Sequence, residues 1–578
     1  MLRLRDLGCL AVVALSPFES DAVALPVPGL GLRLTALEAA IALAVTGAVA
    51  NAAQTSRRGP QMRPGALVLS TLGLAAAAFV SALAAPAEAR AAWLGAMRLL
   101  GVGLLTFAFA EAVRDAAQRR LVRGSHPGSP LERALAWATA ALLALGALEQ
   151  MGGDGMLGPR GAALDETLLA LFRPKASVTE VGARRLTASF GHANLAACWL
   201  VMATPLLLGA AIAWRRWRQA LGLLALGVVG LAATLSRAGL VAGLAAIGLL
   251  LLFLTFAEQR RTVDFVRGRP KWLTTAVATT ALVALAFVLV ASPSFEDRWG
   301  LRSRPPIAVE YRLTTERTHD GGSRVVLDAT NRGSLCWRPW GRDRHELELR
   351  LPRGVDPGPE AGPTADDAAN ALRRPLAHRV CTGETTTAIW TVAAPLERLA
   401  GARAEVVHNG LHGFAALGVA AATIGPTAEA EFPPPVAGLT PAGRPALWQA
   451  ALALWQQRPL LGHGADNFRL RKATVMDTPG LDDREHANNV LLEVLADLGL
   501  LGALALLALV WYVAVAAWAA WRRADVTAFA AVAACLGFAV HGLADSPLFS
   551  WGPMVLLALA LGTLQARTAS STEHGRSA

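Results

Sequence analysis

Lysine is nearly absent from this chain, and several other marks of a soluble protein are weak. Only three of its 54 basic residues are lysine, and charged residues make up 17% of its 578 residues. The five cysteines include no C-x-x-C pair, which excludes a zinc ribbon and a dithiol redox motif. Hydrophobic residues make up 54% of the chain and its mean hydropathy is +0.41, values that exclude disorder and a soluble globular protein.

The hydrophobic residues come in runs of about 20, the length of helix that crosses about 30 Å of hydrocarbon. The predicted fold class is therefore mainly α, a polytopic membrane protein of about 12 transmembrane helices. The runs lie near residues 6–24, 33–52, 64–85, 91–112, 134–149, 190–213, 219–235, 238–256, 272–293, 499–520, 526–543 and 548–567. The first run is short and leads into Pro17, Glu19 and Asp21, so a signal peptide is an alternative for it.

The formal net charge of +11 would indicate nucleic acid in a soluble protein, but here the arginines gather in alternate short loops between apolar runs. That alternation is the positive-inside pattern of a multi-pass protein, so no nucleic-acid partner is expected. With both chain ends in the cytoplasm, three segments lie outside: the loop 150–189, the tight turn at Ser236 and Arg237, and the long stretch 294–486. Any chemistry is expected there.

A change of composition near Pro305 predicts a separate domain. Short alternating runs such as Glu-Leu-Glu-Leu-Arg-Leu, separated by Gly, Pro and Asp, indicate a small all-β sandwich over 305–426. The order Asn331-Arg332-Gly333, Cys336-Trp337 and Gly413-Phe414 resembles Ig-like modules. Cys336 and Cys381 are expected to form a disulfide, because both fall outside while the other cysteines lie in spans. The predicted organisation is a membrane domain 1–294, the sandwich, a helix and loop 427–486, and a second membrane part 487–578.

Two arginines are candidate anion ligands. Arg237 lies between two apolar runs with almost no loop, at an outer membrane edge where a guanidinium is costly unless an anion receives it. The alternative is an arginine that snorkels to the interface. Arg444 begins an amphipathic helix, where its charge opposes the helix dipole but would suit an anion pocket. The alternative there is an exposed charged face.

A polar stripe follows at the entrance to the next span. His486, Asn489 and Glu493 are spaced to lie on one face of a helix, which in a membrane requires an aqueous cavity or a ligand. The alternative is a solvated interfacial histidine.

Two further polar groups, at Asn194 and at Asp545, are predicted at the same level. The histidines at 192, 463, 486 and 541 match no compact ligand spacing, so no metal is expected. No Walker loop, dinucleotide-binding fingerprint or G-x-S-x-G elbow occurs either, which argues against ATP-driven transport, a nucleotide-sugar domain and a serine hydrolase.

These pieces resemble the O-antigen ligase and polymerase family of membrane glycosyltransferases. The matching segments are 189–194, 235–239, 443–448, 459–464, 492–502 and 545–548. The resemblance implies a GT-C-like protein of the bacterial inner membrane with its active site facing the periplasm. It also implies inverting transfer of a glycan from undecaprenyl diphosphate to an acceptor hydroxyl, on lipid A core, another glycan or a protein, without a cofactor or nucleotide sugar.

The resemblance assigns donor diphosphate binding to Arg237 and Arg444, and a general base to a histidine. The family usually has that histidine eleven residues before the glycine that is Gly499 here, a slot occupied by Asn488. His486 lies two residues earlier and is the candidate base. Asn194, Asn488, Asn489, Glu493 and Asp545 are the remaining candidate substrate-binding residues.

Other functions stay open from the sequence. A polymerase of repeat units or a protein O-oligosaccharyltransferase shares the same motifs. A transporter or flippase of lipid-linked sugars would need midplane charges and an internal repeat, whereas the span interior at 219–232 is nearly uncharged and no repeat is visible. A non-catalytic scaffold would leave the arginine pair without a role.

Overall fold

The computed structural model describes most of the chain, in segments separated by gaps. These are residues 4–18, 24–27, 32–56, 65–85, 88–123, 130–153, 186, 190, 192–214, 216–259, 308–333, 336–337, 339, 344–352, 354–356, 371–408, 412–417, 421–424, 444–476 and 485–574.

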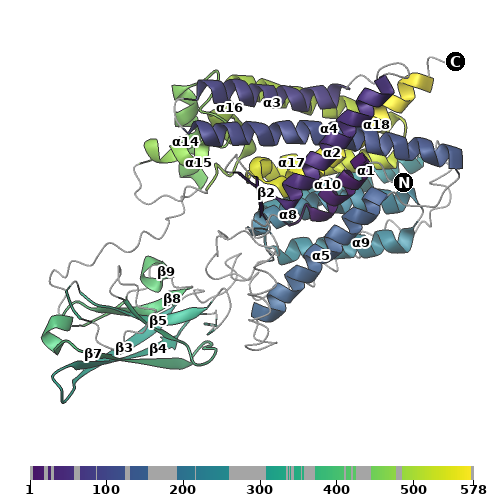
Figure 1. The fold of residues 1–578 in the computed structure, drawn as a ribbon. Coiled ribbons are helices and arrows are strands. Elements are labelled where there is room, and N and C mark those ends of the chain that lie inside the picture. The colour runs from purple at the N-terminus through teal and green to yellow at the C-terminus, as the bar shows by residue number, and fades with distance from the viewer. Residues whose placement is uncertain are drawn as a thin grey trace.

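The membrane region is a bundle of helices (Figure 1). In chain order the helices are α1 (Leu4–Leu15), α2 (Ala36–Ser56), α3 (Ala66–Ala84), α4 (Ala89–Arg123), α5 (Pro130–Gly153), α8 (Ala193–Ala213), α9 (Trp217–Ala233), α10 (Arg237–Gln259), α14 (Arg444–Gln457), α15 (Phe468–Arg471), α16 (Val490–Arg522), α17 (Val526–Gly542) and α18 (Trp551–His574). Short 3-10 turns add Lys472–Thr474 and Pro547–Phe549.

Among the described residues, six helices are long and apolar enough to cross a membrane: α2, α3, α4, α8, α10 and α16. The chain is therefore a multi-pass membrane protein. Two more apolar helices, α9 and α17, are shorter. A total of about 12 spans stays a prediction, and the run near 272–293 lies outside the described residues.

The first apolar run does not form the span expected over 6–24. Helix α1 ends at Leu15, and a short strand β1 (Ala24–Val27) pairs antiparallel with β2 (Leu32–Thr35). Twelve residues of helix reach only about 18 Å, less than the hydrocarbon thickness. Pro17 favours this end of the helix, because it has no backbone N–H to bond the carbonyl four residues earlier and disfavours a helical conformation in the residue before it.

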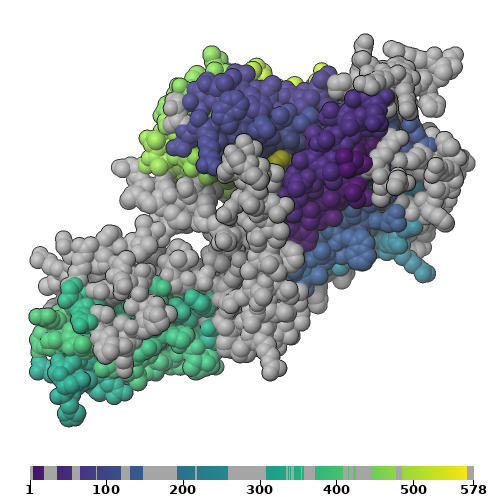
Figure 2. Space-filling view, in the orientation of Figure 1, coloured from purple at the N-terminus to yellow at the C-terminus, as the bar shows by residue number. Residues whose placement is uncertain are grey.

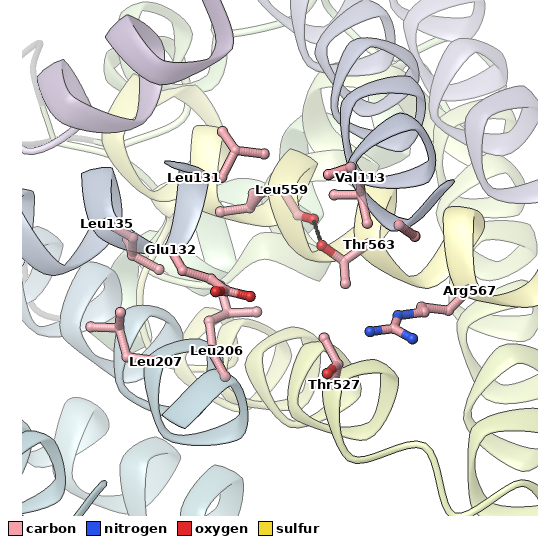
Figure 3. A pocket seen from close by; sticks show the side chains of 13 residues that line it. Val113, Leu131, Glu132, Leu135, Leu206, Leu207, Thr527, Leu559, Thr563 and Arg567 are labelled. Atoms are coloured by element: carbon pink, nitrogen blue, oxygen red, sulfur yellow. Dashed lines mark hydrogen bonds between the residues drawn. The ribbon is translucent and has the colours of Figure 1, made fainter. Parts of the chain in front are cut away.

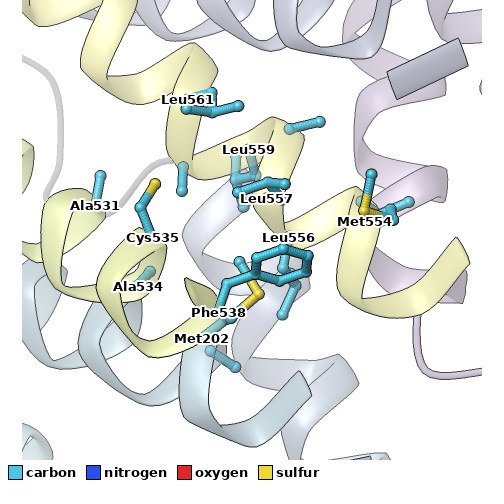
Figure 4. Packing of buried hydrophobic residues seen from close by; sticks show 14 of the residues in the cluster. Met202, Ala531, Ala534, Cys535, Phe538, Met554, Leu556, Leu557, Leu559 and Leu561 are labelled. Atoms are coloured by element: carbon cyan, nitrogen blue, oxygen red, sulfur yellow. The ribbon is translucent and has the colours of Figure 1, made fainter. Parts of the chain in front are cut away.

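Helix α8 lies at the centre of the bundle: 89% of the residues in its most apolar stretch are buried, compared with 17% for the corresponding stretch of α16. Figure 4 shows the core beside it, where Met202 of α8 packs with Phe538 of α17 and Leu556 of α18. Small residues allow close approach: a Cβ on Gly209 would lie 2.2 Å from the Cβ of Ala530.

Helices α1 to α4 form much of the face of the bundle seen in Figure 2. Large apolar side chains are exposed on this set of helices, including Val49, Leu69 and Leu83. Apolar exposure of this kind fits contact with lipid.

The inserted segment is all-β, as its alternation predicts. The strands are β3 (Val309–Arg317), β4 (Ser323–Asn331), β5 (His345–Arg350), β6 (Ala371–Pro375), β7 (Thr385–Val392), β8 (Arg403–His408), β9 (His412–Gly413) and β10 (Ala422–Thr423). They form two antiparallel sheets, β3-β4-β7 and β10-β8-β5-β6, with β9 on β8. Side chains of both sheets share one apolar core, which contains Trp337 and Trp390. Cys336 and Cys381 are joined by a disulfide. The Ig-like assignment and the domain boundaries stay predictions.

Candidate functional site

Asn489 caps helix α16 and ties it to the loop after α17. Its Oδ1 accepts hydrogen bonds from the backbone N–H groups of Leu491 (3.0 Å) and Leu492 (3.2 Å). Such a cap satisfies donors that the first turn of a helix leaves free. The Asn489 Nδ2 donates to the carbonyl of Leu543 (3.1 Å), and its backbone N–H donates to Ser546 Oγ (3.2 Å). These contacts give Asn489 a clear structural role.

The helical stripe expected for His486, Asn489 and Glu493 is wrong for His486, because the helix begins only at Val490. Asn488 has a φ of +53°, a left-handed conformation that asparagine tolerates better than most residues. The chain therefore turns just before the cap, and His486 lies outside the helix.

His486 nevertheless contacts Glu493. Its Nδ1 forms a hydrogen bond with Glu493 Oε1. The imidazole also stacks on Phe549, with ring centroids 6.1 Å apart and planes 19° apart. A quarter of the His486 side chain is exposed, whereas Glu493 is buried and its Oε2 has no hydrogen-bond partner among the described residues.

The carboxylate of Glu493 sets the protonation of His486. Burial alone would lower the pKa of His486, but the charge and hydrogen bond of Glu493 outweigh it and raise that pKa. The contact also engages Nδ1 and leaves Nε2 as the ring nitrogen available to a substrate. A histidine oriented by a carboxylate in this way can accept a proton.

One turn further along α16, Asp497 fastens the glycine-rich loop that follows α14. Its Oδ2 accepts from the backbone N–H of Asp466 (2.8 Å) and its Oδ1 from that of Phe468 (2.7 Å). Its backbone carbonyl accepts from Ser81 Oγ (2.7 Å) and from the N–H of Gly464 (2.8 Å). The carboxylate is fully buried, so its hydrogen bonds replace lost hydration and fix the loop against the helix.

The same junction requires two glycines. Gly499 interrupts α16 with φ 63° and ψ −159°, a conformation open essentially to glycine alone. A Cβ there would lie 2.5 Å from the backbone of Leu460. Gly462 has φ +66°, and its Cβ would lie 2.4 Å from the backbone of Asp497. The loop and the helix therefore touch through bare backbone.

The carboxylate of Asp466 contacts two arginines beside this junction. Arg469 of α15 grips it bidentately, with Nε 2.9 Å from Oδ1 and Nη2 3.2 Å from Oδ2. Arg98 of α4 places Nη1 3.7 Å from Oδ2 and donates to the carbonyl of Phe549 at 3.4 Å. Phe549 is the ring on which His486 stacks, so these arginines belong to the same neighbourhood as the His486–Glu493 pair.

A second polar group lies between α17 and α8. Asp545 accepts from the backbone N–H of Ser546 (2.8 Å), and its Oδ2 lies 3.4 Å from Nε2 of the buried His541. Burial would raise the pKa of Asp545, but the imidazoles of His541 and His192 outweigh burial and hold it at about 2. His192 accepts from the backbone N–H of Asn194 (3.2 Å) and caps α8. In the described part of the chain, no group of three or more His, Cys, Asp or Glu could hold a metal ion.

Arg237 and Arg444 are exposed at the first residues of α10 and α14. Arg237 follows a tight turn in which Ser236 Oγ accepts from the N–H of Gly239 (3.1 Å). Among the described residues, none of the hydrogen bonds and ion pairs of His486, Glu493 and Asp466 involves Arg237 or Arg444.

Arg98, Asp466 and Asp497 carry no motif that marks them as site residues in the sequence. An arginine inside the apolar run 91–112 was a usable signal for Arg98, because charge within a span is costly. Asp497 had no such signal, since the backbone groups that it binds lie about 30 residues earlier in the chain.

A cavity of about 80 Å³, shown in Figure 3, is lined by none of the residues around His486 described above. Its wall includes Glu132, Thr527, Thr563 and Arg567. Thr527 is near the start of α17, whereas His541 is near its end, a separation of about 21 Å along the helix. The cavity is thus not the place where the polar residues around His486 meet.

Comparison with known proteins gives one family. A family model described as "O-Antigen ligase" matches residues 436–507, the segment that contains α14, the glycine-rich loop, His486 and the first half of α16. No curated protein and no solved structure matches the chain. The match confirms the resemblance indicated by the motifs: residues 436–507 are similar to the O-antigen ligase family.

Proposed function

We propose that this protein transfers a glycan from undecaprenyl diphosphate to an acceptor hydroxyl at the periplasmic face of the bacterial inner membrane, as an O-antigen ligase-type enzyme. The acceptor is the lipid A core or a similar glycan. The transfer inverts the anomeric carbon and uses neither a nucleotide sugar nor a cofactor. Membrane lipids surround the site, and the donor reaches it from the bilayer.

One observation carries the proposal: the His486–Glu493 pair lies inside the segment that matches the O-antigen ligase family. Asn488 occupies the slot in which the family usually has its histidine. His486, two residues earlier, has features that a general base needs: partial exposure, a carboxylate on one ring nitrogen, and a second nitrogen that bonds none of the described residues.

In the proposed reaction, the acceptor hydroxyl attacks the anomeric carbon while its proton passes to His486 Nε2. The new glycosidic C–O bond forms as the bond from the anomeric carbon to the diphosphate oxygen breaks, and undecaprenyl diphosphate leaves. Glu493 stabilises the imidazolium that results, because its buried carboxylate faces Nδ1. Glu493 acts through His486 and is a positioning residue.

The departing diphosphate gains negative charge, and guanidinium groups are suited to stabilise it because each presents a planar fork of N–H donors. Arg237 and Arg444 are proposed for this role on the basis of the family resemblance. Each stands exposed at a helix N-terminus, where a bound anion would offset its repulsion with the helix dipole.

The test is reconstitution of the purified full chain in proteoliposomes with an undecaprenyl-diphosphate-linked glycan and a lipid A core acceptor. We expect transfer by the native chain and a loss of about 100- to 10,000-fold in His486→Gln, the range typical of a missing general base. His319→Ala is the matched control, because His319 is an exposed histidine of the β domain. Full activity in His486→Gln would refute the proposed base, and no transfer by the native chain to any acceptor would refute the function.

A further inference from the structure

We propose that Arg98 is a ligand of the donor's diphosphate group, in the same site as His486. This inference rests on the proposed function, since it names a further residue that binds the substrate of that reaction. It follows from where Arg98 lies in α4, from what already occupies Asp466, and from the contacts that fix the guanidinium beside Phe549.

Arg98 lies within a membrane-crossing helix. It is the tenth residue of α4, about 13 Å from the start of the helix at Ala89. An arginine at that depth is unfavourable in hydrocarbon, so such residues face a polar cavity or a partner. Its side chain is 37% exposed, so it is partly accessible to a ligand.

The position of Arg98 is fixed by a close contact between α4 and the glycine-rich loop. A Cβ on Gly464 would lie 2.6 Å from Ala92 Cβ, and a Cβ on Gly95 would lie 2.8 Å from Ala465. Positions 92, 95 and 98 follow one another at helical spacing along one face, and they meet residues 464, 465 and 466 in order. Arg98 is thereby aligned with Asp466.

Asp466 does not satisfy the hydrogen-bond donors or the positive charge of Arg98. Both oxygens of Asp466 already accept hydrogen bonds from Arg469, at 2.9 and 3.2 Å, so Arg98 is the second cation on one carboxylate. Its own contacts are long, 3.7 Å to Asp466 and 3.4 Å to the carbonyl of Phe549, and both use Nη1. The Nε and Nη2 donors of this guanidinium have no hydrogen-bond acceptor among the described residues. A diphosphate would supply such acceptors and the missing negative charge.

The location also suits the reaction. Phe549 receives the hydrogen bond of Arg98 on its carbonyl and stacks its ring on His486. Phe549 therefore links the guanidinium of Arg98 to the ring of the proposed base. This is the arrangement that a transfer between a diphosphate leaving group and an activated hydroxyl requires.

The test measures binding as well as transfer. The purified full chain in nanodiscs is titrated with farnesyl diphosphate, and separately with farnesyl monophosphate and farnesol. We expect the native chain to prefer the diphosphate, and Arg98→Ala to bind it about 10- to 100-fold more weakly. Arg98→Lys should recover only part of the affinity, because lysine keeps the charge but loses the fork. Arg90→Ala is the matched control, an exposed arginine on the same helix, and should bind like the native chain.

The outcomes separate this inference from the proposed function. Unchanged farnesyl diphosphate affinity in Arg98→Ala would overturn the inference, even if the variant unfolds at a lower temperature, because that pattern is what a purely structural role in holding Asp466 would give. Failure of the native chain to bind the probe would overturn it as well. Diphosphate binding through Arg98 without glycan transfer by the native chain would instead support the site and refute the proposed function.

Discussion

Replacing Gly499 by alanine should disrupt the junction between α16 and the glycine-rich loop. At φ 63° and ψ −159° an alanine costs about 1–3 kcal/mol in backbone strain. The added Cβ would also lie 2.5 Å from the carbonyl carbon and oxygen of Leu460, which are backbone atoms and cannot rotate away. The loop must therefore shift. The shift would break the hydrogen bonds from Leu500 N–H to the Pro459 carbonyl (2.8 Å) and from Leu501 N–H to the Leu460 carbonyl (3.2 Å).

Those two hydrogen bonds contribute about 0.5–1.5 kcal/mol each. Alanine also lowers the conformational entropy of the unfolded chain, which offsets about 0.4–1 kcal/mol of the cost. The net cost is then about 1–5.5 kcal/mol, which at its upper end is a large part of the 5–15 kcal/mol that typically holds a protein folded. We expect Gly499→Ala to lower the unfolding temperature in detergent clearly and to reduce the yield of monodisperse protein.

Gly73→Ala is the matched control for this substitution. Gly73 lies inside α3, and a Cβ built on it meets no atom of the described segments within 4 Å. The same chemical change there should be neutral or stabilising by about 0.5–1 kcal/mol. Equal unfolding temperatures for Gly499→Ala, Gly73→Ala and the native chain, measured by fluorescence-detected size exclusion after heating, would show that the junction is not held as argued.

Glu493→Gln should shift the pH profile of transfer. The base must be neutral, so the transfer rate rises with pH through the pKa of His486, which Glu493 raises above the usual value. In Glu493→Gln the carboxylate charge is gone and burial lowers the pKa of His486. The rising part of the pH profile should therefore move to lower pH. An unmoved midpoint would count against the pair. Arg237→Lys should reduce the transfer rate about 100- to 1,000-fold at matched protein abundance, nearly as much as Arg237→Ala, because lysine cannot form the bidentate contact with diphosphate, worth about 3–4 kcal/mol. Full activity in Arg237→Lys would remove this residue from the site. Cys336→Ser should destabilise the β domain by about 2–4 kcal/mol, seen as faster limited proteolysis within 308–424; an unchanged cleavage rate would argue against a stabilising role for the disulfide.

The sequence predicted those features whose cause is local. Runs of about 20 apolar residues indicated most of the described helices, and the tight turn at Ser236 is present because Thr234 and Ser236 bond their neighbours' backbone. Strand alternation predicted the all-β domain, including the run that forms β5. β6 was missed, because Ala371–Pro375 shows no apolar alternation and owes its strand to pairing with β5.

The site was only partly predictable, because its contacts join distant segments. Spacing alone brought His486 and Glu493 together, but on a continuous helix that the Asn489 cap excludes. Asp497 looked like one more residue of a span, since nothing near it in sequence shows that it binds the backbone of residues 466 and 468. Arg98 meets Asp466 across 368 positions, a pairing that periodicity cannot predict.

The contacts around the candidate site form a closed ring. Arg98 bonds the Phe549 carbonyl, the Phe549 ring stacks on His486, and His486 pairs with Glu493. Glu493 lies one helical turn before Asp497, whose carboxylate binds the backbone of Asp466, and Asp466 faces Arg98. In a closed ring of this kind, no member can move alone, so the distance from the proposed base to the proposed anion ligand is fixed by the whole set. Gly499→Ala, which displaces the glycine-rich loop, should therefore weaken farnesyl diphosphate binding and glycan transfer together. Glu493→Gln should instead change transfer and leave diphosphate binding intact.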